Sequence, residues 1–221
     1  LNNLKLALYS RDLLQEIRHE TDITYDAKKR GIIEIYRNVK TMDSSIAHAE
    51  WLNQLGCRNK ILSQKSCFEL EPALKESDTD ILGGIYTPDD ESGDAYRFTC
   101  NIAHKASSNG VNFQYGETIQ CLKDLGGRIK YVKTDKGECY ADAFVISLGS
   151  FSPLFLKSLG IYLPIYPAKG HSLTIPIGGR NNAPELSITD TDNKIVYSRL
   201  GNRLRVAGTA EFSGYNTKLN K

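Results

Sequence analysis

The sequence has no long apolar run and no spacing typical of a metal site. Its 221 residues include no stretch of the roughly 18 apolar side chains that a membrane-spanning helix needs. The five cysteines lie far apart without a CxxC pair, and the four histidines show no metal-ligand spacing. We therefore expect reduced thiols, a cytoplasmic location and no bound metal.

The chain also has no excess of charge of either sign. Its 28 basic and 26 acidic residues are well mixed and give a net charge of +2. No basic stripe is present, so the sequence gives no support for nucleic-acid binding. Apolar residues make up 40% of the chain, which is ordinary for a folded globular protein.

The start of the chain is typical of a segment that continues from something earlier. Leu1 stands where an initiator Met is usual, and residues 4–8 already resemble the middle of a helix. We therefore expect the sequence to be a piece cut from a longer protein.

Apolar spacing near the helical period predicts several helices. They are expected at residues 3–19, 43–55, 94–108 and 152–159, with a short one from Ser66. Asp43, Ser66 and Asp94 have the residue types that cap helix N-termini, so each is expected to begin a helix.

Runs of β-branched and aromatic residues predict the strands. They are expected at residues 23–25, 31–36, 61–64, 83–87, 111–115, 118–123, 128–134, 143–148, 170–175, 186–189, 195–199 and 203–207. Residues 23–25 are expected to pair with 31–36, and the continuous apolar run 143–148 to form a strand buried on both faces.

Helices and strands in separate runs indicate an α+β fold. We expect one antiparallel main sheet with flanking helices, and a smaller unit beside it at about residues 111–159. The main sheet is expected to contain residues 31–36, 83–87, 170–175, 195–199 and 203–207.

Three features could carry chemistry, and each has an ordinary structural alternative. Gly149, before Ser150, would let the backbone approach a flat cofactor, although such a glycine is more often a matter of packing. Lys169, before Gly170, could place positive charge beside a cofactor, or could be a solvated turn residue.

The third feature is the predicted strand 195–199. Tyr197 and Arg199 share one face of it by the period of 2, so together they could bind a carboxylate. An ordinary cross-strand pair fits these residues equally well.

These segments together resemble the small subunit of bacterial D-amino acid dehydrogenases, a branch of the D-amino acid oxidase-like flavoproteins. The resemblance runs in order over essentially the whole chain. The segments that carry it are residues 84–94 (GIYTPDDESGD), 148–150 (LGS), 166–177 (YPAKGHSLTIPI) and 203–211 (RLRVAGTAE).

The resemblance implies an FAD enzyme that oxidises D-amino acids, typically D-alanine, to 2-oxo acids and ammonia and passes electrons to a membrane acceptor. A peripheral position at the inner membrane is then an alternative to a purely cytoplasmic one. No side chain is implied as a catalytic acid or base, because the protein mainly orients its cofactor and substrate.

The resemblance also assigns roles to residues and segments. Thr118 would contact the adenine through its backbone, Gly149 and Ser150 would pass near the cofactor, and Lys169 and Gly170 would lie by the flavin. Relatives carry an aromatic at the start of strand 195–199, where this sequence has Ile195, so the expectation that Tyr197 and Arg199 face the substrate comes from their place on the same face of that strand. Residues 1–110 and 161–221 would form the two parts of a substrate-binding domain, and residues 111–160 part of an FAD-binding domain.

Two family segments have no counterpart in this sequence. One is the N-terminal G-x-G-x-x-G turn that holds the pyrophosphate, and the other is the C-terminal glycine-rich segment with the substrate-binding arginine. We therefore expect a fragment of about half the parent enzyme that is inactive alone and retains little FAD. Another amine or 2-hydroxy-acid oxidoreductase of the same superfamily, or a non-catalytic remnant, stays an open alternative.

Overall fold

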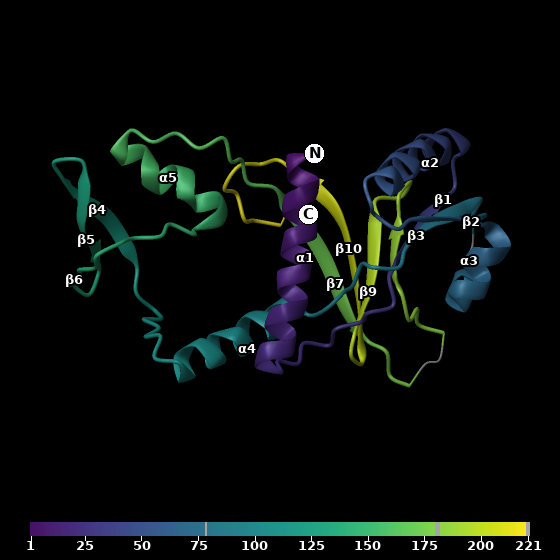
Figure 1. Cartoon of the computed structure of the whole chain (residues 1–221), viewed down its shortest axis with the longest axis horizontal. Helices are drawn as coiled ribbons and strands as arrows, with labels where there is room; N and C mark the ends of the chain where they lie inside the picture. Colours follow the sequence, from purple (N-terminus) through teal and green to yellow (C-terminus); the bar gives the residue numbers. More distant parts are fainter. Residues whose placement is uncertain (78, 180–181, 220–221) are drawn as a thin grey trace. The chain divides into compact units, whose positions relative to one another are not determined.

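The computed structural model describes residues 1–77, 79–179 and 182–219 (Figure 1). The chain divides into two compact units, each described here by itself. The first unit contains Leu1–Asn109 and Gly170–Ala210, and the second contains Gly110–Lys169 and the residues from Glu211 onward. The predicted assignment of residues 1–110, 111–160 and 161–221 to domain roles stays a prediction.

The helices follow the predicted order along the chain, with small shifts at their ends. The α-helices are α1 (Asn2–Thr21), α2 (Val39–Gln54), α3 (Gln64–Leu70), α4 (Ala95–Ser108) and α5 (Ser152–Leu156), and the 3-10 helices are η1 (Pro72–Glu76), η2 (Gly149–Phe151) and η3 (Lys157–Leu159). None of the helices in the described ranges is both long and apolar enough to cross a membrane.

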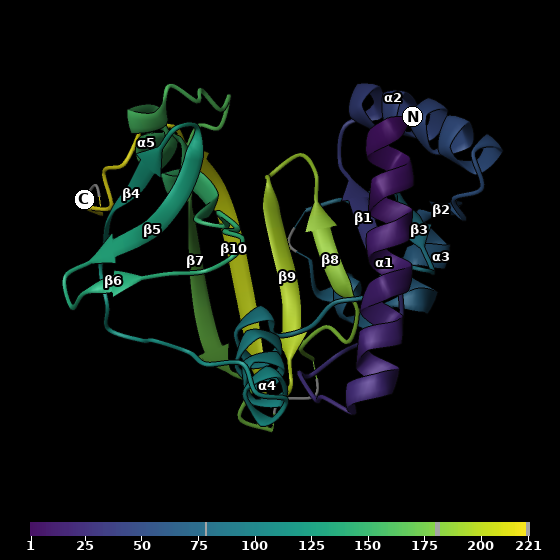
Figure 2. The same cartoon turned by 60° about the vertical axis from the view of Figure 1, so that its left-hand side comes forward.

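Most strands of the described residues join one large sheet. The strands are β1 (Ile32–Tyr36), β2 (Lys60–Ser63), β3 (Gly83–Thr87), β4 (Ile119–Leu125), β5 (Arg128–Thr134), β6 (Glu138–Cys139), β7 (Lys169–Pro176), β8 (Ser187–Asp190), β9 (Ile195–Leu200) and β10 (Arg203–Glu211). A seven-stranded sheet has the order β2-β3-β1-β8-β9-β10-β7, and a three-stranded sheet the order β4-β5-β6 (Figure 2).

The α+β class is confirmed, and the large sheet contains all five strands predicted for it. The pairs β1–β3, β2–β3, β8–β9 and β9–β10 are antiparallel, as expected. The pair β1–β8 is parallel, so the sheet is mixed rather than wholly antiparallel. This pair joins segments about 155 residues apart, and local sequence patterns carry no information on their direction.

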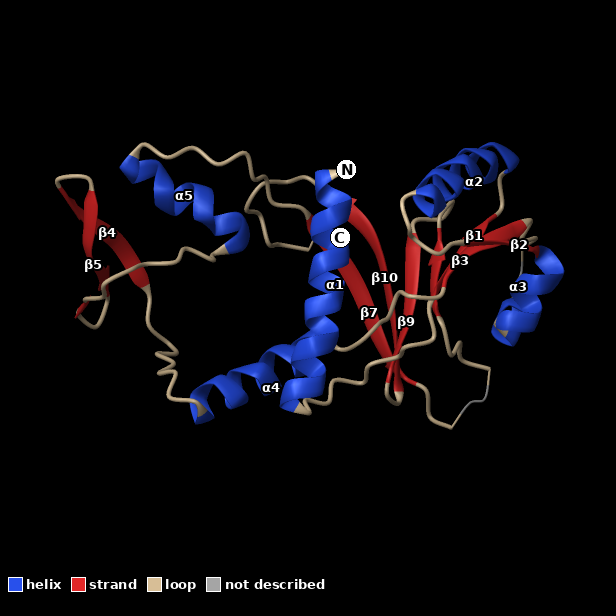
Figure 3. Cartoon of the chain, viewed as in Figure 1, coloured by secondary structure: helices blue, strands red, loops and turns tan. Residues whose placement is uncertain are grey.

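Alternate residues of β1 place the core on both faces of the sheet. Ile33 and Ile35 pack on one face with Cys67 of α3 and Leu74 of η1. Tyr36 packs on the other face with residues of α2 and β3. Figure 3 accordingly shows α2 and α3 on the two sides of strands β1–β3.

Gly84 of β3 is required by this close packing. A Cβ atom at this position would lie 2.7 Å from the Glu34 carbonyl oxygen and 3.0 Å from the Cys67 sulfur. Any side chain there would separate β3 from β1 or push α3 away from the sheet.

Helix capping was predicted correctly at one of three positions. Asp94 caps α4 and accepts hydrogen bonds from the Tyr96 and Arg97 amides at 3.0 and 3.1 Å. The caps of α2 and α3 are Asn38 and Ser63, so the predictions at Asp43 and Ser66 were wrong. Ser66 lies in the first turn of α3 and Asp43 in the second turn of α2, because an earlier residue supplies the capping oxygen in each helix.

Three predicted strands are absent from the described residues. Residues 23–25 form no ladder, because their carbonyl groups bind the start and body of α4 instead. The side-chain amide of Asn101 donates to the Thr24 carbonyl, and the backbone amide of Asp94, the N-cap of α4, donates to the Tyr25 carbonyl. Residues 111–115 and 143–148 also form no ladder, and Val145 is 88% exposed. The apolar run 143–148 was expected to be buried, but among the described residues no strand pairs with it.

Candidate functional site

Tyr197 lies in the middle of β9, an interior strand of the large sheet. It stands opposite Ile188 of β8 and Val206 of β10, and it packs against the core cluster around Ile33 and Ile35. Its ring therefore lies on the same face of the sheet as α3 and η1. The Tyr197 hydroxyl forms no hydrogen bond within the described part of the chain.

A cavity of about 220 Å³ adjoins this ring. Its apolar wall includes Ile35, Leu74, Ile188 and Leu204, which come from β1, η1, β8 and β10. Its polar lining includes Arg37, Ser77 and Asp190. A cavity with an apolar wall and a few polar groups is typical of small-molecule sites.

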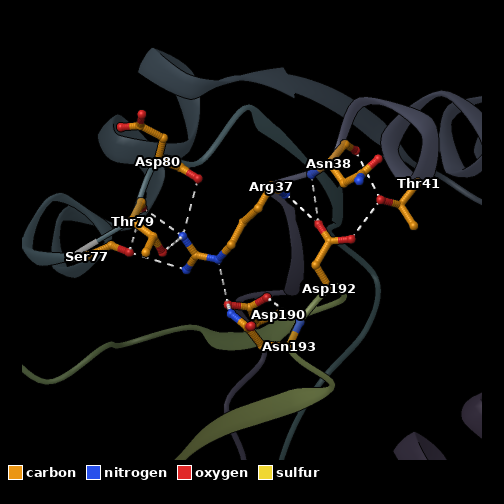
Figure 4. Close-up of polar contacts among 9 residues, drawn as sticks. All are labelled: Arg37, Asn38, Thr41, Ser77, Thr79, Asp80, Asp190, Asp192 and Asn193. Atoms are coloured by element: carbon orange, nitrogen blue, oxygen red, sulfur yellow. Dashed lines mark hydrogen bonds and ion pairs between the residues drawn. The ribbon is translucent and has the colours of Figure 1, made fainter.

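The charge of Arg37 is compensated inside the protein (Figure 4). Its Nε donates to the Asp190 carboxylate at 2.9 Å, and Asp190 is 2% exposed. Its Nη1 donates to the Thr79 carbonyl at 2.7 Å, and its Nη2 to the Ser77 hydroxyl at 3.3 Å. The cavity is therefore lined by an ion pair rather than by a free cation.

The Asp192 carboxylate holds the backbone at Arg37 in place. Its carboxylate accepts from the Arg37 amide at 2.6 Å, the Asn38 amide at 3.0 Å and the Thr41 hydroxyl at 2.7 Å (Figure 4). The Arg37 amide, followed by Thr41 and Asn38, lowers the pKa of this carboxyl and outweighs the opposing effect of burial. The β8–β9 connection thus holds both the backbone and the side chain of Arg37.

Sequence reasoning missed Arg37, Asp190 and Asp192. Each of these contacts joins residues more than 150 positions apart, and nothing in the local sequence around Arg37 marks its partner. The one sequence signal for these contacts is the pair of acidic residues, Asp190 and Asp192, that follows the predicted strand 186–189. Residues 180 and 181 precede that strand but lie outside the described residues.

Arg199 shares a strand face with Tyr197 but has a different environment. Its guanidinium forms an ion pair with Glu185, which also accepts from the Lys28 ammonium at 2.8 Å. The hydrogen bond from Lys28 is the largest effect on Glu185 and lowers its pKa, helped by the charges of Arg199 and Arg30. Arg199 does not line the 220 Å³ cavity that adjoins Tyr197.

Lys169 begins β7 and is also held by a carboxylate. Its ammonium lies 3.0 Å from the Glu211 carboxylate and donates to the Lys218 carbonyl at 2.9 Å. The side chain is only 17% exposed. The solvated-turn alternative therefore does not describe it, because the ammonium is largely covered and its charge is paired.

The glycines predicted to approach a cofactor differ in their surroundings. Gly149 has φ +55° and no atom within 4 Å of the place of a Cβ, so its backbone faces open space. Gly170 would bring a Cβ only to 3.7 Å from the Thr209 carbonyl, which is an ordinary contact. The carbonyl of Ser150 accepts a hydrogen bond from the Tyr215 hydroxyl at 2.7 Å.

Thr118 has both backbone groups engaged within the second unit. Its amide donates to the Asp135 carboxylate at 2.9 Å, and its carbonyl accepts from the Asp135 amide at 3.0 Å. The open backbone at Gly149 fits the close approach of a flat ring such as a flavin. The Thr118 amide could contact adenine only where the Asp135 carboxylate gives up its bond, whereas the Thr118 carbonyl oxygen has a second lone pair with which it can accept from adenine.

The described residues contain no cluster of side chains that could hold a metal.

The chain matches one family model along its whole length. The model is described as FAD dependent oxidoreductase and matches residues 1–221. D-amino acid dehydrogenase of Allorhizobium ampelinum is 45% identical over 216 residues, which are 98% of this chain and 51% of that protein. The D-amino acid dehydrogenase of Dechloromonas aromatica is 44% identical over 98% of this chain and 53% of that protein. The chain thus spans about half the length of the curated relatives it matches.

Solved structures agree on the fold. Glycine oxidase from Geobacillus kaustophilus superposes with a TM-score of 0.84 at 23% identity, over 98% of this chain and 58% of that one. L-proline dehydrogenase from P. horikoshii gives a TM-score of 0.83 at 18% identity, over 97% and 57%. Since the family model covers every residue, this chain belongs to the family of FAD dependent oxidoreductases.

Proposed function

We propose that this chain forms the substrate-binding part, and a segment of the flavin-binding part, of an enzyme that oxidises D-amino acids to 2-oxo acids and ammonia. The observation that carries the proposal is the 45% identity to a D-amino acid dehydrogenase over 98% of the chain. D-alanine, or another D-amino acid with a small side chain, is the proposed substrate.

FAD, when bound, would accept the hydride that leaves the substrate Cα. Gly149 and Ser150 would lie against the cofactor, since the backbone at Gly149 is open to close approach. Lys169 and Gly170 would lie beside the ring, where the lysine would hold positive charge. Thr118 would meet the adenine through its backbone, where its carbonyl oxygen can accept a hydrogen bond beside the one from the Asp135 amide.

Tyr197 would hold the substrate through its hydroxyl, which has no partner in the described part of the chain. The adjoining cavity of about 220 Å³ would receive the amino acid side chain. Its apolar wall favours a methyl or small aliphatic group, and the Arg37–Asp190 ion pair offers no free cation there, while Glu76 disfavours an acidic side chain.

Arg199 is the second proposed substrate-binding residue. Its fork would suit the substrate carboxylate, provided that the carboxylate takes the place now held by Glu185. The Lys28 contact would then keep Glu185 paired after the exchange. A peripheral attachment at the cytoplasmic face of the inner membrane, with a membrane electron acceptor, completes the proposed setting.

The 221-residue chain by itself is proposed to be inactive and to retain little FAD. It spans about half of its relatives, and the pyrophosphate-binding turn expected of the family has no counterpart in its sequence. Purification of this chain in the presence of excess FAD tests this point. Near-equimolar flavin absorbance after gel filtration would contradict the proposal.

A substrate panel on the complete protein tests the proposed activity. D-alanine, L-alanine, glycine, sarcosine and D-lactate are compared with an artificial dye as electron acceptor. Dye reduction by D-alanine, with kcat/KM at least about tenfold above that for each other compound, supports the proposal. A preference for glycine, sarcosine or D-lactate assigns the enzyme to another activity of the superfamily, and no turnover with any compound supports a non-catalytic remnant.

A further inference from the structure

A second and larger cavity lies in the first unit, between α1, α2 and the strands β1 and β3. Its volume is about 640 Å³. It includes Ile32 and Glu34, which alternate along β1 with the core residues Ile33 and Ile35. It therefore opens on the other face of the sheet from the Tyr197 cavity, and the proposed reaction does not use it.

Helix α1 forms the apolar wall of this cavity. None of its 20 residues is buried, although a helix of this length usually buries one face. The half-buried side chains Leu4, Leu8, Arg11 and Leu14 recur at helical spacing and all line the cavity. The apolar face of α1 thus borders a hollow rather than a packed core.

Carboxylates dominate the opposite wall. Two of them are neutralised by arginines: Asp89 pairs with Arg58, and Glu91 pairs with Arg18 at 2.5 Å. The Asp90 carboxylate accepts no hydrogen bond and forms no ion pair within the described ranges. Its charge is exposed to the cavity.

Glu34 is the second carboxylate without a cationic partner among the described residues. It accepts a hydrogen bond from the Tyr36 hydroxyl at 2.5 Å, which leaves its negative charge uncompensated. Arg11 is the remaining cation in the lining, and its only ion pair in the described residues is a 3.4 Å contact with its neighbour Asp12. Glu34 and Asp90 against Arg11 give the cavity an excess of one negative charge.

Glu91 adds an independent sign that the wall is incomplete. Its side chain is 10% exposed, and Arg18 binds only its Oε2 atom. Its Oε1 atom is buried and has no hydrogen-bond partner in the described residues. A buried carboxylate oxygen without a donor is unfavourable, so a movement of the Glu91 side chain that turned Oε1 toward a donor in the cavity would stabilise this wall.

We propose that this cavity binds a small organic monocation with an apolar body. The ammonium group lies between Glu34 and Asp90, and the aliphatic part lies along Leu4, Leu8 and Leu14 of α1. The same features disfavour anions, because a carboxylate would face Glu34 and Asp90, and they give neutral apolar compounds only the contact with α1.

Three probes of equal length test the charge requirement. Hexylamine, hexan-1-ol and hexanoate are titrated into the complete protein at neutral pH, with binding followed by calorimetry and by amide chemical shifts. Hexylamine is expected to bind in a 1:1 complex, at least about tenfold more tightly than hexan-1-ol, with shifts at residues 32–34 and 87–91. Hexanoate is expected not to bind at this place. Equal binding of hexylamine and hexan-1-ol, or no binding of hexylamine, would overturn the proposal.

Variants locate the site. Glu34→Gln with Asp90→Asn should weaken hexylamine binding about tenfold or more, and Glu16→Gln with Glu20→Gln is the matched control because it removes two carboxylates from α1 outside the cavity. Leu8→Trp should block the cavity and abolish binding without any change of charge. Unchanged affinity in both the Glu34→Gln, Asp90→Asn double variant and Leu8→Trp would show that the cation binds elsewhere.

Discussion

The Nε atom of Arg37 donates to the buried carboxylate of Asp190 at 2.9 Å and so ties the end of β1 to the end of β8. These two strands form the parallel pair of the large sheet. The contact therefore fastens a join between distant segments that no hairpin supports.

Arg37→Met is expected to destabilise the protein strongly. It leaves Asp190 as a buried carboxylate without its cation, which costs about 3 kcal/mol or more of unfolding free energy. Arg58→Met is the control, because Arg58 is 72% exposed and an ion pair at the surface contributes little to stability. Urea unfolding of both variants measures the difference. Equal losses would show that the Arg37 pair contributes no more than a surface contact.

The Tyr36 hydroxyl is expected to lose its proton at an unusually high pH. Burial, and next the hydrogen bond to Glu34, raise the pKa of Tyr36 from 10.0 to about 12. The folded protein thus holds this proton more tightly than the unfolded chain. The resulting stability is present below pH 10 and is lost as the pH rises from 10 towards 12.

The absorbance at 295 nm, compared between the wild type and Tyr36→Phe, isolates this group from the other tyrosines. Glu34→Gln should lower the midpoint but leave it above 10, because burial is the larger cause. A difference spectrum that titrates at 10 in the folded protein would refute the predicted shift.

Lys169 and Glu211 should affect the reaction in opposite directions. Lys169→Met removes the cation and leaves the charge of Glu211 in place, so flavin reduction in the complete protein should slow by about tenfold. Glu211→Gln keeps the cation and should leave reduction as fast as in the wild type, or faster. Rapid mixing with D-alanine measures both rates. Equal rates in the two variants would make the pair purely structural.

Tyr197→Phe should weaken substrate binding. Loss of one hydrogen bond costs about 1 kcal/mol, which raises KM several-fold with little change in kcat. Tyr86→Phe is a suitable control, since the Tyr86 hydroxyl donates to the Arg30 carbonyl and lines neither cavity. A KM unchanged by Tyr197→Phe would leave Tyr197 as an ordinary residue of the sheet.

Much of the fold could be predicted because its signals are local. The β9–β10 hairpin, the β4–β5 hairpin around Gly126-Gly127 and the Asp94 cap each depend on a few consecutive residues. The parallel β1–β8 pair could not be predicted, since it joins distant segments and its direction follows from the whole topology. The prediction that residues 143–148 form a buried strand was wrong, because apolar composition alone does not show whether a partner strand is available.

The candidate site, like the fold, has features that local sequence patterns predict and features that they do not. Tyr197 and Arg199 could be placed on one face from the strand period, but their partners could not. Glu185 holds Arg199, and Glu211 holds Lys169, through contacts that no spacing rule indicates. Local patterns thus identified Arg199 and Lys169 as candidate site residues. The carboxylates that neutralise their charges, Glu185 and Glu211, are apparent only in the folded structure.

Anaerobic mixing of the complete, FAD-loaded protein with D-alanine tests the central claim most directly. The account predicts that D-alanine bleaches the flavin absorbance near 450 nm and releases one pyruvate per flavin, while L-alanine at the same concentration leaves the spectrum unchanged. Bleaching by L-alanine at the same rate, or no bleaching by any D-amino acid, would contradict the assignment of this chain to a D-amino acid oxidising enzyme.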